Sequence, residues 1–146
     1  MRVTAELRHG RNIVGGSVEN TQTTLLVTNA LGMAINRCEK ADRLVAHSDR
    51  GVQFTSWAFS RKVRDAGPPS MGTVGSAYDN AMAEPFSERM QVELFNRKRW
   101  NTRVELSTAI HDYIELVHNT GRRHSALGML TPTAYQDLHN ATQQAA

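Results

Sequence analysis

The 146-residue chain has one cysteine, few aromatic residues and no long hydrophobic run. Because Cys38 has no partner cysteine, an internal disulfide framework and a cysteine-rich zinc module are excluded. Phe, Trp and Tyr make up 6% of the residues, so the core must consist mainly of Leu, Val, Ile, Met and Ala. The longest apolar stretch, at residues 25–35, is too short and too interrupted to span a bilayer, and the N-terminus lacks a signal-peptide pattern. These absences predict a soluble cytoplasmic protein with no membrane partner.

The charge is slightly basic, with 17 Lys and Arg residues against 14 Asp and Glu residues and a formal net charge of +3. A basic excess of this size allows a nucleic-acid partner and does not require one. The length suits one domain of ordinary size.

Hydrophobic periodicity predicts a mixed α and β chain with more helix in its second half. Residues 11–18 are expected to form a weak strand, loosened by Gly15 and Gly16. Apolar residues that recur at helical spacing predict a helix over 23–36. A short strand is expected at 44–47.

Capping residues predict the starts of three further helices. One begins after Thr55 or Ser56, and another after Asp79. The next begins after Thr102, where Glu105 has the spacing of a capping box. Its inward-facing residues are predicted to be Leu106, Ile110, Tyr113, Ile114 and Val117.

The C-terminal region is expected to contain one more short helix. Thr131 is a capping residue and Pro132 suits the first helical position, which predicts a helix from Pro132 to Leu138. A polar turn is expected at residues 118–121, and the residues after Asn140 are expected to be disordered.

Asp49 and Glu84 are the residues that most directly suggest chemistry. Asp49 follows a predicted strand, a usual place for a functional group in an α/β sheet, and Glu84 lies near the start of a predicted helix. Two carboxylates brought together repel each other, and Mg²⁺ removes that penalty because it selects carboxylate oxygens. Spacing alone leaves the alternative open in which Asp49 is a loop residue and Glu84 a solvated helix residue.

Three ordered motifs give these residues a context. They are HSDRGVQFTS at 47–56, SMG followed by YDNAMAE within 70–84, and HN followed by RHSALG and TP within 118–132. In this order they resemble the second-aspartate, glutamate and C-terminal motifs of insertion-sequence transposases with a retroviral-integrase-like (DDE) core. The resemblance covers roughly residues 11–138.

The resemblance implies an α/β fold, the ribonuclease-H-like integrase core, in which helices flank a mixed sheet. It also implies that three carboxylates hold two Mg²⁺ or Mn²⁺ ions for cleavage and transfer of DNA strands. Asp49 and Glu84 are then catalytic metal ligands, and Asn80 helps to orient the glutamate helix. The implied partners are DNA and either a second copy of the chain or a full-length transposase in a mixed oligomer.

Several positions depart from the family pattern. The family's first aspartate has no counterpart, because Asp42 lies just ahead of the strand that leads to Asp49 and residues 1–10 match nothing in the family. We therefore expect a core that lacks its first strands and its first catalytic carboxylate. The spacing from Asp49 to Glu84 is one residue short. Pro85 is expected to disfavour the α conformation of Glu84 and to remove a helical hydrogen bond.

Two short basic clusters are expected to contact DNA phosphates, and they consist of Arg97, Lys98 and Arg99, and of Arg122 and Arg123. The alternative for each cluster is a solvated charged surface. Trp100 can stack on a base, although it is expected to cover the edge of the core.

The motifs divide the chain into an unmatched segment at 1–10, a partial catalytic core at 11–124 and a C-terminal part at 125–146. The first hypothesis is a transposase core for DNA integration and transposition by metal-dependent strand cleavage and transfer. This chain is then expected to be inactive because one of the three carboxylates is absent. The alternative is a non-catalytic remnant that binds DNA or interferes with assembly of a full-length transposase. The sequence alone therefore leaves open whether the chain is an enzyme.

Overall fold

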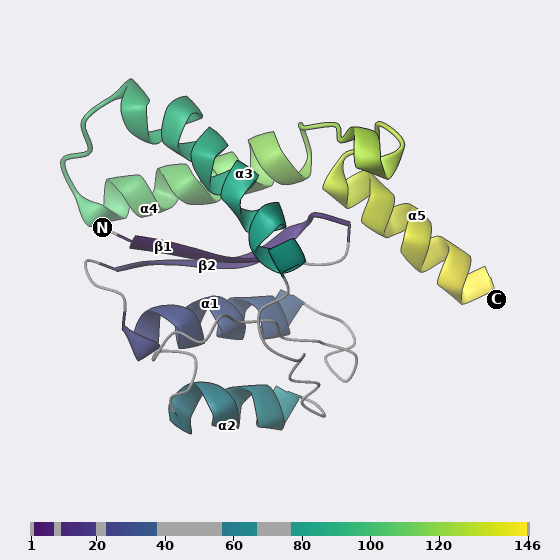
Figure 1. Cartoon of the computed structure of the whole chain (residues 1–146), viewed down its shortest axis with the longest axis horizontal. Helices are drawn as coiled ribbons and strands as arrows, with labels where there is room; N and C mark the ends of the chain where they lie inside the picture. Colours follow the sequence, from purple (N-terminus) through teal and green to yellow (C-terminus); the bar gives the residue numbers. More distant parts are fainter. Residues whose placement is uncertain (1, 8–9, 20–22, 38–56, 67–76, 146) are drawn as a thin grey trace. The chain divides into compact units, whose positions relative to one another are not determined.

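The structure, a computed structural model, describes residues 2–7, 10–19, 23–37, 57–66 and 77–145 (Figure 1). The chain divides into two compact units. The first comprises Met1–Glu6 and Val14–Glu88, and the second comprises Leu7–Ile13 and Arg89–Ala146. Each unit has buried apolar residues of its own.

Strands β1 (Arg2–Leu7) and β2 (Ile13–Glu19) pair in a two-stranded sheet (Figure 1). The connection at residues 8–12 is too short for a parallel crossover, so the two strands form an antiparallel hairpin. β2 confirms the strand predicted at 11–18, whereas β1 occupies a segment in which the sequence predicted no element. The mixed sheet and its missing strands stay predictions, because the strand expected at 44–47 lies outside the described residues.

Helix α1 (Thr24–Arg37) packs closely on β2 and confirms the helix predicted over 23–36. Its buried apolar residues are Leu26, Val27, Ala30, Leu31 and Ala34. A Cβ atom at Gly15 would lie 2.3 Å from the Ala30 carbonyl oxygen. Gly15 is therefore required by the close approach of the helix backbone, which is a stronger role than the predicted loosening of the strand.

Helix α2 (Trp57–Ala66) lies beside α1 in the first unit (Figure 1). A Cβ atom at Gly32 of α1 would lie 2.6 Å from Lys62 Nζ, so the glycine makes room for the lysine side chain. The helix predicted after Thr55 or Ser56 is confirmed, while the two capping residues lie outside the described residues.

Helix α3 (Ala77–Glu93) begins in the first unit and ends in the second. Pro85 lies in its interior, and the helix continues through it. The expectation that Pro85 moves Glu84 out of the α conformation is therefore wrong. An interior proline costs a helix roughly 3 kcal/mol. Burial of Phe86 and Met90 offsets that cost, because a buried side chain of this size contributes about 1.5–3 kcal/mol.

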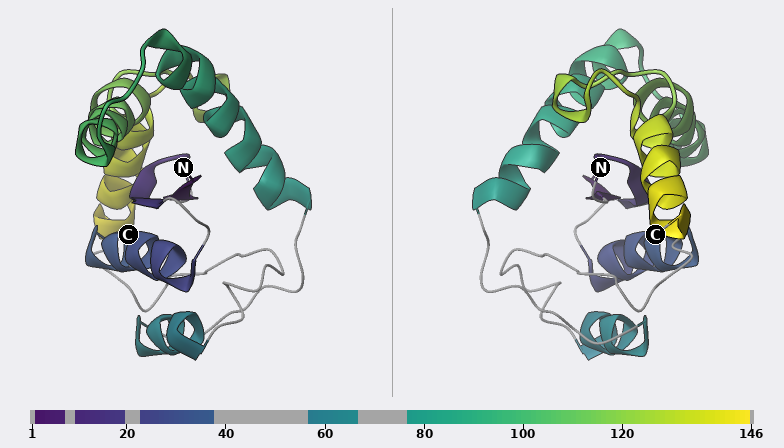
Figure 2. Two further views of the ribbon diagram at one scale, coloured as in Figure 1. Left: turned by 90° about the vertical axis from the view of Figure 1, so that its left-hand side faces the viewer. Right: turned by 90° about the vertical axis from the view of Figure 1, so that its right-hand side faces the viewer.

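The described part of the second unit is mainly helical (Figure 2). After α3 its elements are η2 (Phe95–Arg97), α4 (Arg103–Asp112), η3 (Tyr113–Asn119), η4 (Ser125–Leu127) and α5 (Pro132–Ala145). Burial confirms the inward face predicted for Leu106, Ile110, Tyr113 and Ile114. Among the helices of the described segments, none is long and apolar enough to cross a membrane.

The π-helical geometry of η3 changes which side chains are buried at the end of this helical run. Val117, which α-helical periodicity places on the inward face, is 41% exposed. His118 and Asn119, which were expected in a polar turn, are buried instead. A π-helical segment has more residues per turn than an α-helix, so the inward face advances along the sequence.

Helix α5 begins as predicted but extends further. Thr131 Oγ1 accepts a hydrogen bond from the Ala134 backbone N–H at 3.2 Å, and Pro132 occupies the first helical position. The helix predicted to end at Leu138 continues to Ala145, so the expected disorder after Asn140 is corrected. Side-chain hydrogen bonds between residues four apart support the extra turns, namely Gln136 with Asn140 and His139 with Gln143.

Candidate nucleic-acid interface

Of the two predicted metal ligands, the structure describes the backbone of Glu84 and does not describe Asp49. Asp49 lies outside the described residues, whereas Asn80 and Glu84 lie one turn apart on the backbone of α3. Within the described segments, no three His, Cys, Asp or Glu side chains are grouped so that they could hold a metal ion. The pairing of Asp49 with Glu84 and the positioning role of Asn80 stay predictions.

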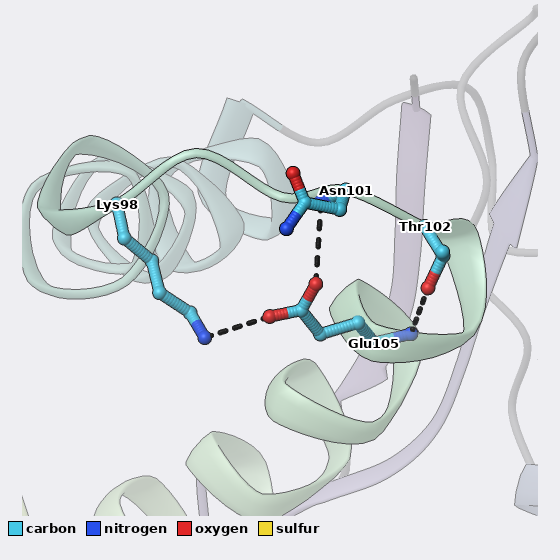
Figure 3. A network of polar contacts seen from close by, with 4 residues as sticks. All are labelled: Lys98, Asn101, Thr102 and Glu105. Carbon is cyan, nitrogen blue, oxygen red and sulfur yellow. Dashed lines mark hydrogen bonds and ion pairs between the residues drawn. The ribbon is translucent and has the colours of Figure 1, made fainter.

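Lys98 of the first basic cluster contacts the start of α4 (Figure 3). Its Nζ lies 2.8 Å from Glu105 Oε1 and 4.5 Å from the centroid of the Trp100 ring. The hydrogen bond from Lys98, followed by that from the Asn101 backbone N–H, lowers the pKa of the Glu105 carboxyl. Trp100 is half-buried, as expected for a side chain at the edge of a core. The charge of Lys98 is therefore partly balanced within the protein.

The capping box predicted at the start of α4 is present (Figure 3). Thr102 Oγ1 accepts a hydrogen bond from the Glu105 backbone N–H at 3.1 Å. Glu105 Oε2 accepts a hydrogen bond from the Asn101 backbone N–H at 3.2 Å, one residue before the cap. The local sequence therefore fixes both the start of α4 and the position of the Lys98 ion pair.

Arg97, Arg99 and Arg123 are exposed to solvent. Long exposed guanidinium side chains can reach a phosphate without giving up an internal contact. Among the residues predicted to contact DNA, these three are therefore the most accessible to a phosphate.

Arg122 differs from its neighbour because its guanidinium group is engaged inside the second unit. Arg122 Nη2 lies 2.5 Å from Glu93 Oε2, and the Tyr113 hydroxyl donates to the same oxygen at 2.7 Å. Hydrogen bonds from Arg122 and Tyr113 lower the pKa of Glu93. Burial and the neighbouring carboxylate raise the pKa of Tyr113 to about 12. This triad favours a structural role for Arg122.

Asn119 joins the end of η3 to the β1–β2 hairpin. Its Oδ1 accepts a hydrogen bond from the Ile13 backbone N–H at 3.0 Å, and its Nδ2 donates to the Ile13 carbonyl at 2.9 Å. The side-chain amide of Asn119 therefore makes the same pair of hydrogen bonds with Ile13 that the backbone of a neighbouring strand would make. The sequence predicts Asn119 only as a member of a polar turn and of the C-terminal motif. Its side-chain role depends on burial by the π-helical segment.

Two histidines lie next to this contact. His118 Nε2 donates to the Arg11 carbonyl at 3.0 Å, which requires the tautomer protonated at Nε2. The His124 ring meets the His118 ring edge-on, with 5.4 Å between the ring centroids. Burial is the main cause that lowers the pKa of His118 and brings the pKa of His124 to about 4. Burial therefore favours the neutral form of both rings.

The chain is similar to integrase cores and to several transposases. A family model described as the integrase core domain matches residues 68–132. The chain is 35% identical over 131 residues to a transposase for insertion sequence element IS904 from Lactococcus lactis, covering 89% of this chain and 52% of the relative. It is 30% identical over 132 residues to transposase InsF for insertion sequence IS3A from Escherichia coli, covering 90% of this chain and 46% of that relative.

An uncharacterized 31 kDa protein of insertion element IS600 from Shigella sonnei is 33% identical over 129 residues, covering 88% of this chain and 47% of the relative. The chain thus spans about half the length of the curated relatives it matches. No solved structure gives a significant match.

Residues 68–132 thus match the integrase core domain. The resemblance to insertion-sequence transposases with an integrase-like core, which the three motifs predict, is confirmed over about nine tenths of the chain.

Proposed function

We propose that this chain supplies part of the catalytic core of an insertion-sequence transposase that acts on DNA. The observation that carries the proposal is the similarity to transposases over about nine tenths of the chain. The proposed architecture is the ribonuclease-H-like arrangement, with residues 11–124 as the partial core and 125–146 as its C-terminal part. The proposed location is the cytoplasm.

Asp49 and Glu84 are the proposed ligands of Mg²⁺ or Mn²⁺. Their donor atoms fit these ions, because hard divalent cations prefer carboxylate oxygens. Metal ions held by these residues would supply the activation of water or of a DNA 3′-hydroxyl group for attack on a phosphodiester bond. The proposed contribution of Asn80, one turn before Glu84 on α3, is to orient the glutamate helix.

The proposed DNA contacts are backbone phosphates bound by Arg97, Lys98, Arg99, Arg122 and Arg123. Exposure favours Arg97, Arg99 and Arg123. Contributions from Lys98 and Arg122 require exchange of an internal carboxylate for a phosphate, because each forms an ion pair within the protein.

The 146-residue chain by itself is proposed to be catalytically inactive, because the family's first aspartate has no counterpart in it. The same observation favours a second candidate function, that of a non-catalytic protein that binds DNA or forms mixed oligomers with a full-length transposase. The two candidates differ in whether Asp49 and Glu84 still bind a metal ion.

A thermal melt followed by circular dichroism, with and without millimolar Mg²⁺, separates these candidates. If the two carboxylates form a site, Mg²⁺ raises the melting temperature because a ligand stabilises the state that binds it. The Asp49→Asn and Glu84→Gln variants then lose this shift, while Asp65→Asn, which changes an exposed carboxylate on α2, retains it. A shift that survives in both site variants would contradict the ligand assignment, and no shift in the parental chain would favour the non-catalytic candidate.

A DNA-nicking assay tests the proposed inactivity. The parental chain is expected to leave supercoiled DNA intact in the presence of Mg²⁺. Nicking that requires both Mg²⁺ and Glu84 would show that the two carboxylates suffice and would overturn this part of the proposal.

A further inference from the structure

The chain has two tryptophans, and the structure gives them different surroundings. Trp100, which the sequence marks as able to stack on a base, is half-buried, and Lys98 Nζ lies 4.5 Å from the centroid of its ring. Trp57, the first residue of α2, is 74% exposed. The Trp57 ring is therefore the more accessible of the two to a ligand.

Arg61 lies about one helical turn after Trp57 and contacts its ring. The guanidinium carbon of Arg61 lies 5.2 Å from the centroid of the Trp57 ring, within the range of a cation–π interaction. This contact holds the indole on one side. Because Trp57 stays 74% exposed, most of its surface is left for another planar group. Aromatic rings accompanied by arginine are a platform on which nucleic-acid bases stack.

The other charges of α2 fit an anionic partner. The basic residues of the helix are Arg61, Lys62 and Arg64, against a single acidic residue. That residue, Asp65, has its Oδ2 atom 3.7 Å from Arg61 Nε, and the side chains of Arg61 and Asp65 are 62% and 68% exposed. An ion pair this exposed contributes little, so a phosphate can replace the carboxylate beside Arg61. Arg64 is exposed as well.

We propose that Trp57 and Arg61 form a site at which one unpaired base of a single-stranded DNA stacks, while Arg61 and Arg64 contact the adjoining phosphates. This Trp57–Arg61 site rests on the proposed function, because DNA is the partner in both, and it lies outside the basic clusters that the sequence singled out. The base has to be unpaired, since the faces of a base inside a duplex are covered by its neighbours in the stack. Stacking requires no particular base, so the site is expected to bind strands of any sequence.

Fluorescence anisotropy with a labelled oligo(dT) strand, and with a labelled duplex of equal length, tests the site. Trp57→Ala is expected to weaken binding of the single strand about tenfold, because one base loses its stacking partner, and to leave binding of the duplex unchanged. Trp57→Phe retains an aromatic ring and is expected to retain most of the affinity. Val104→Ala, at a 75% exposed apolar position on α4, is the matched control and leaves both affinities unchanged.

The salt dependence of single-strand binding separates the roles of the two residues. Trp57→Ala removes no charge, so the slope of log affinity against log salt is expected to stay that of the parental chain. Arg61→Gln is expected to reduce this slope by about 0.7, the contribution of one phosphate contact on a single strand. Arg61→Lys keeps the charge and is expected to keep the slope.

Tryptophan fluorescence identifies the ring that meets the base. Trp100→Phe leaves Trp57 as the only tryptophan, and Trp57→Phe leaves Trp100. Unlabelled oligo(dT) is expected to quench the fluorescence of the Trp100→Phe protein and not that of the Trp57→Phe protein. Quenching of the Trp57→Phe protein alone would transfer the stacking role to Trp100 and overturn the site.

The possible failures are distinguishable. If the parental chain binds DNA and Trp57→Ala binds the single strand with the parental affinity, the site is overturned and the proposed DNA binding stands. If the parental chain binds neither form of DNA, both proposals are overturned. If Trp57→Ala leaves DNA binding unchanged but converts a dimer into a monomer in size-exclusion chromatography, the exposed tryptophan is instead a contact between two copies of the chain.

Discussion

The two compact units are stabilised by different kinds of contact. In the first, apolar residues of α1 face a strand whose Gly15 lets the backbones approach closely. In the second, His118, Asn119 and His124 are buried. His118 and Asn119 are hydrogen-bonded to the hairpin, and the His124 ring meets the His118 ring edge-on. Close backbone contact is sensitive to added volume, whereas a buried polar group is sensitive to loss of its partner or a change in its charge. The first unit should therefore respond mainly to side-chain size and the second mainly to hydrogen bonding and pH.

The largest expected effect is from Gly15→Val in the first unit. A Cβ atom at this position would lie 2.3 Å from the Ala30 carbonyl oxygen and 2.9 Å from the Ala34 nitrogen, and neither backbone atom can move aside cheaply. We expect the free energy of unfolding to fall by about 3 kcal/mol or more, as measured by urea denaturation. Gly128→Ala is the control, because its Cβ meets no atom within 4 Å and only the positive φ of 63° costs free energy, about 1 kcal/mol. Equal losses in the two variants would show that α1 and β2 do not pack this closely.

Asn119→Leu tests the buried hydrogen bonds of the second unit. The substitution keeps the approximate volume but leaves the backbone N–H and carbonyl of Ile13 without the side chain that pairs with them. We expect the free energy of unfolding to fall by about 2–3 kcal/mol. Asn101→Leu changes an exposed side chain and is expected to cost less than about 0.5 kcal/mol. A loss as small as that of the control would contradict the pairing of Asn119 with the hairpin.

The buried histidines predict an acid-sensitive second unit. Their folded pKa values lie below the ordinary 6.5, so the unfolded chain binds more protons as the pH falls through this value. The contribution of the two neutral imidazoles to the free energy of unfolding is therefore fully present above pH 6.5 and decreases as the pH falls toward 4.5. Below pH 4.5 the contribution of the ionised Glu93 carboxyl begins to be lost as well. The expected loss is on the order of 2 kcal/mol, measured by denaturation at several pH values.

His124→Asn is expected to flatten this pH dependence, since it removes the histidine with the lower pKa. His111→Asn, at an exposed position on α4, is its matched control and should leave the profile unchanged. A profile that is equally flat in the parental chain would show that the imidazoles are solvated.

The smallest effects are expected at the start of α4, on the surface of the second unit. Thr102→Ala removes the side chain that caps the helix and should cost about 1 kcal/mol. Lys98→Ala removes an exposed ion pair and should cost less than about 0.5 kcal/mol, with a smaller difference in high salt. Thermal denaturation of both variants checks this order, and a larger loss for Lys98→Ala would mean that the ion pair is more important than the cap.

The helices were largely predictable from the sequence because their signals are local. Apolar spacing located α1, and the capping residues Thr102 and Thr131 marked the starts of α4 and α5. The motifs also predicted the similarity to insertion-sequence transposases, which is confirmed over about nine tenths of the chain. The roles assigned to Asp49, Asn80 and Glu84 also come from those motifs, and metal binding and nicking are the measurements that test them.

Other features needed the tertiary structure, because their cause lies in residues far apart in the sequence. Composition and periodicity determined that this protein forms amphipathic helices, and its short motifs resemble those of insertion-sequence transposases. Only packing decided that Gly15 had to remain glycine, since the atom it would meet belongs to α1. Only the π-helical turn of η3 brought His118 and Asn119 inward, where they bond to residues more than a hundred positions earlier in the chain. Residue spacing predicts burial only for one helical period and only among residues that are close in the sequence. A buried polar group, in contrast, forms its hydrogen bond with whichever partner the fold brings near it.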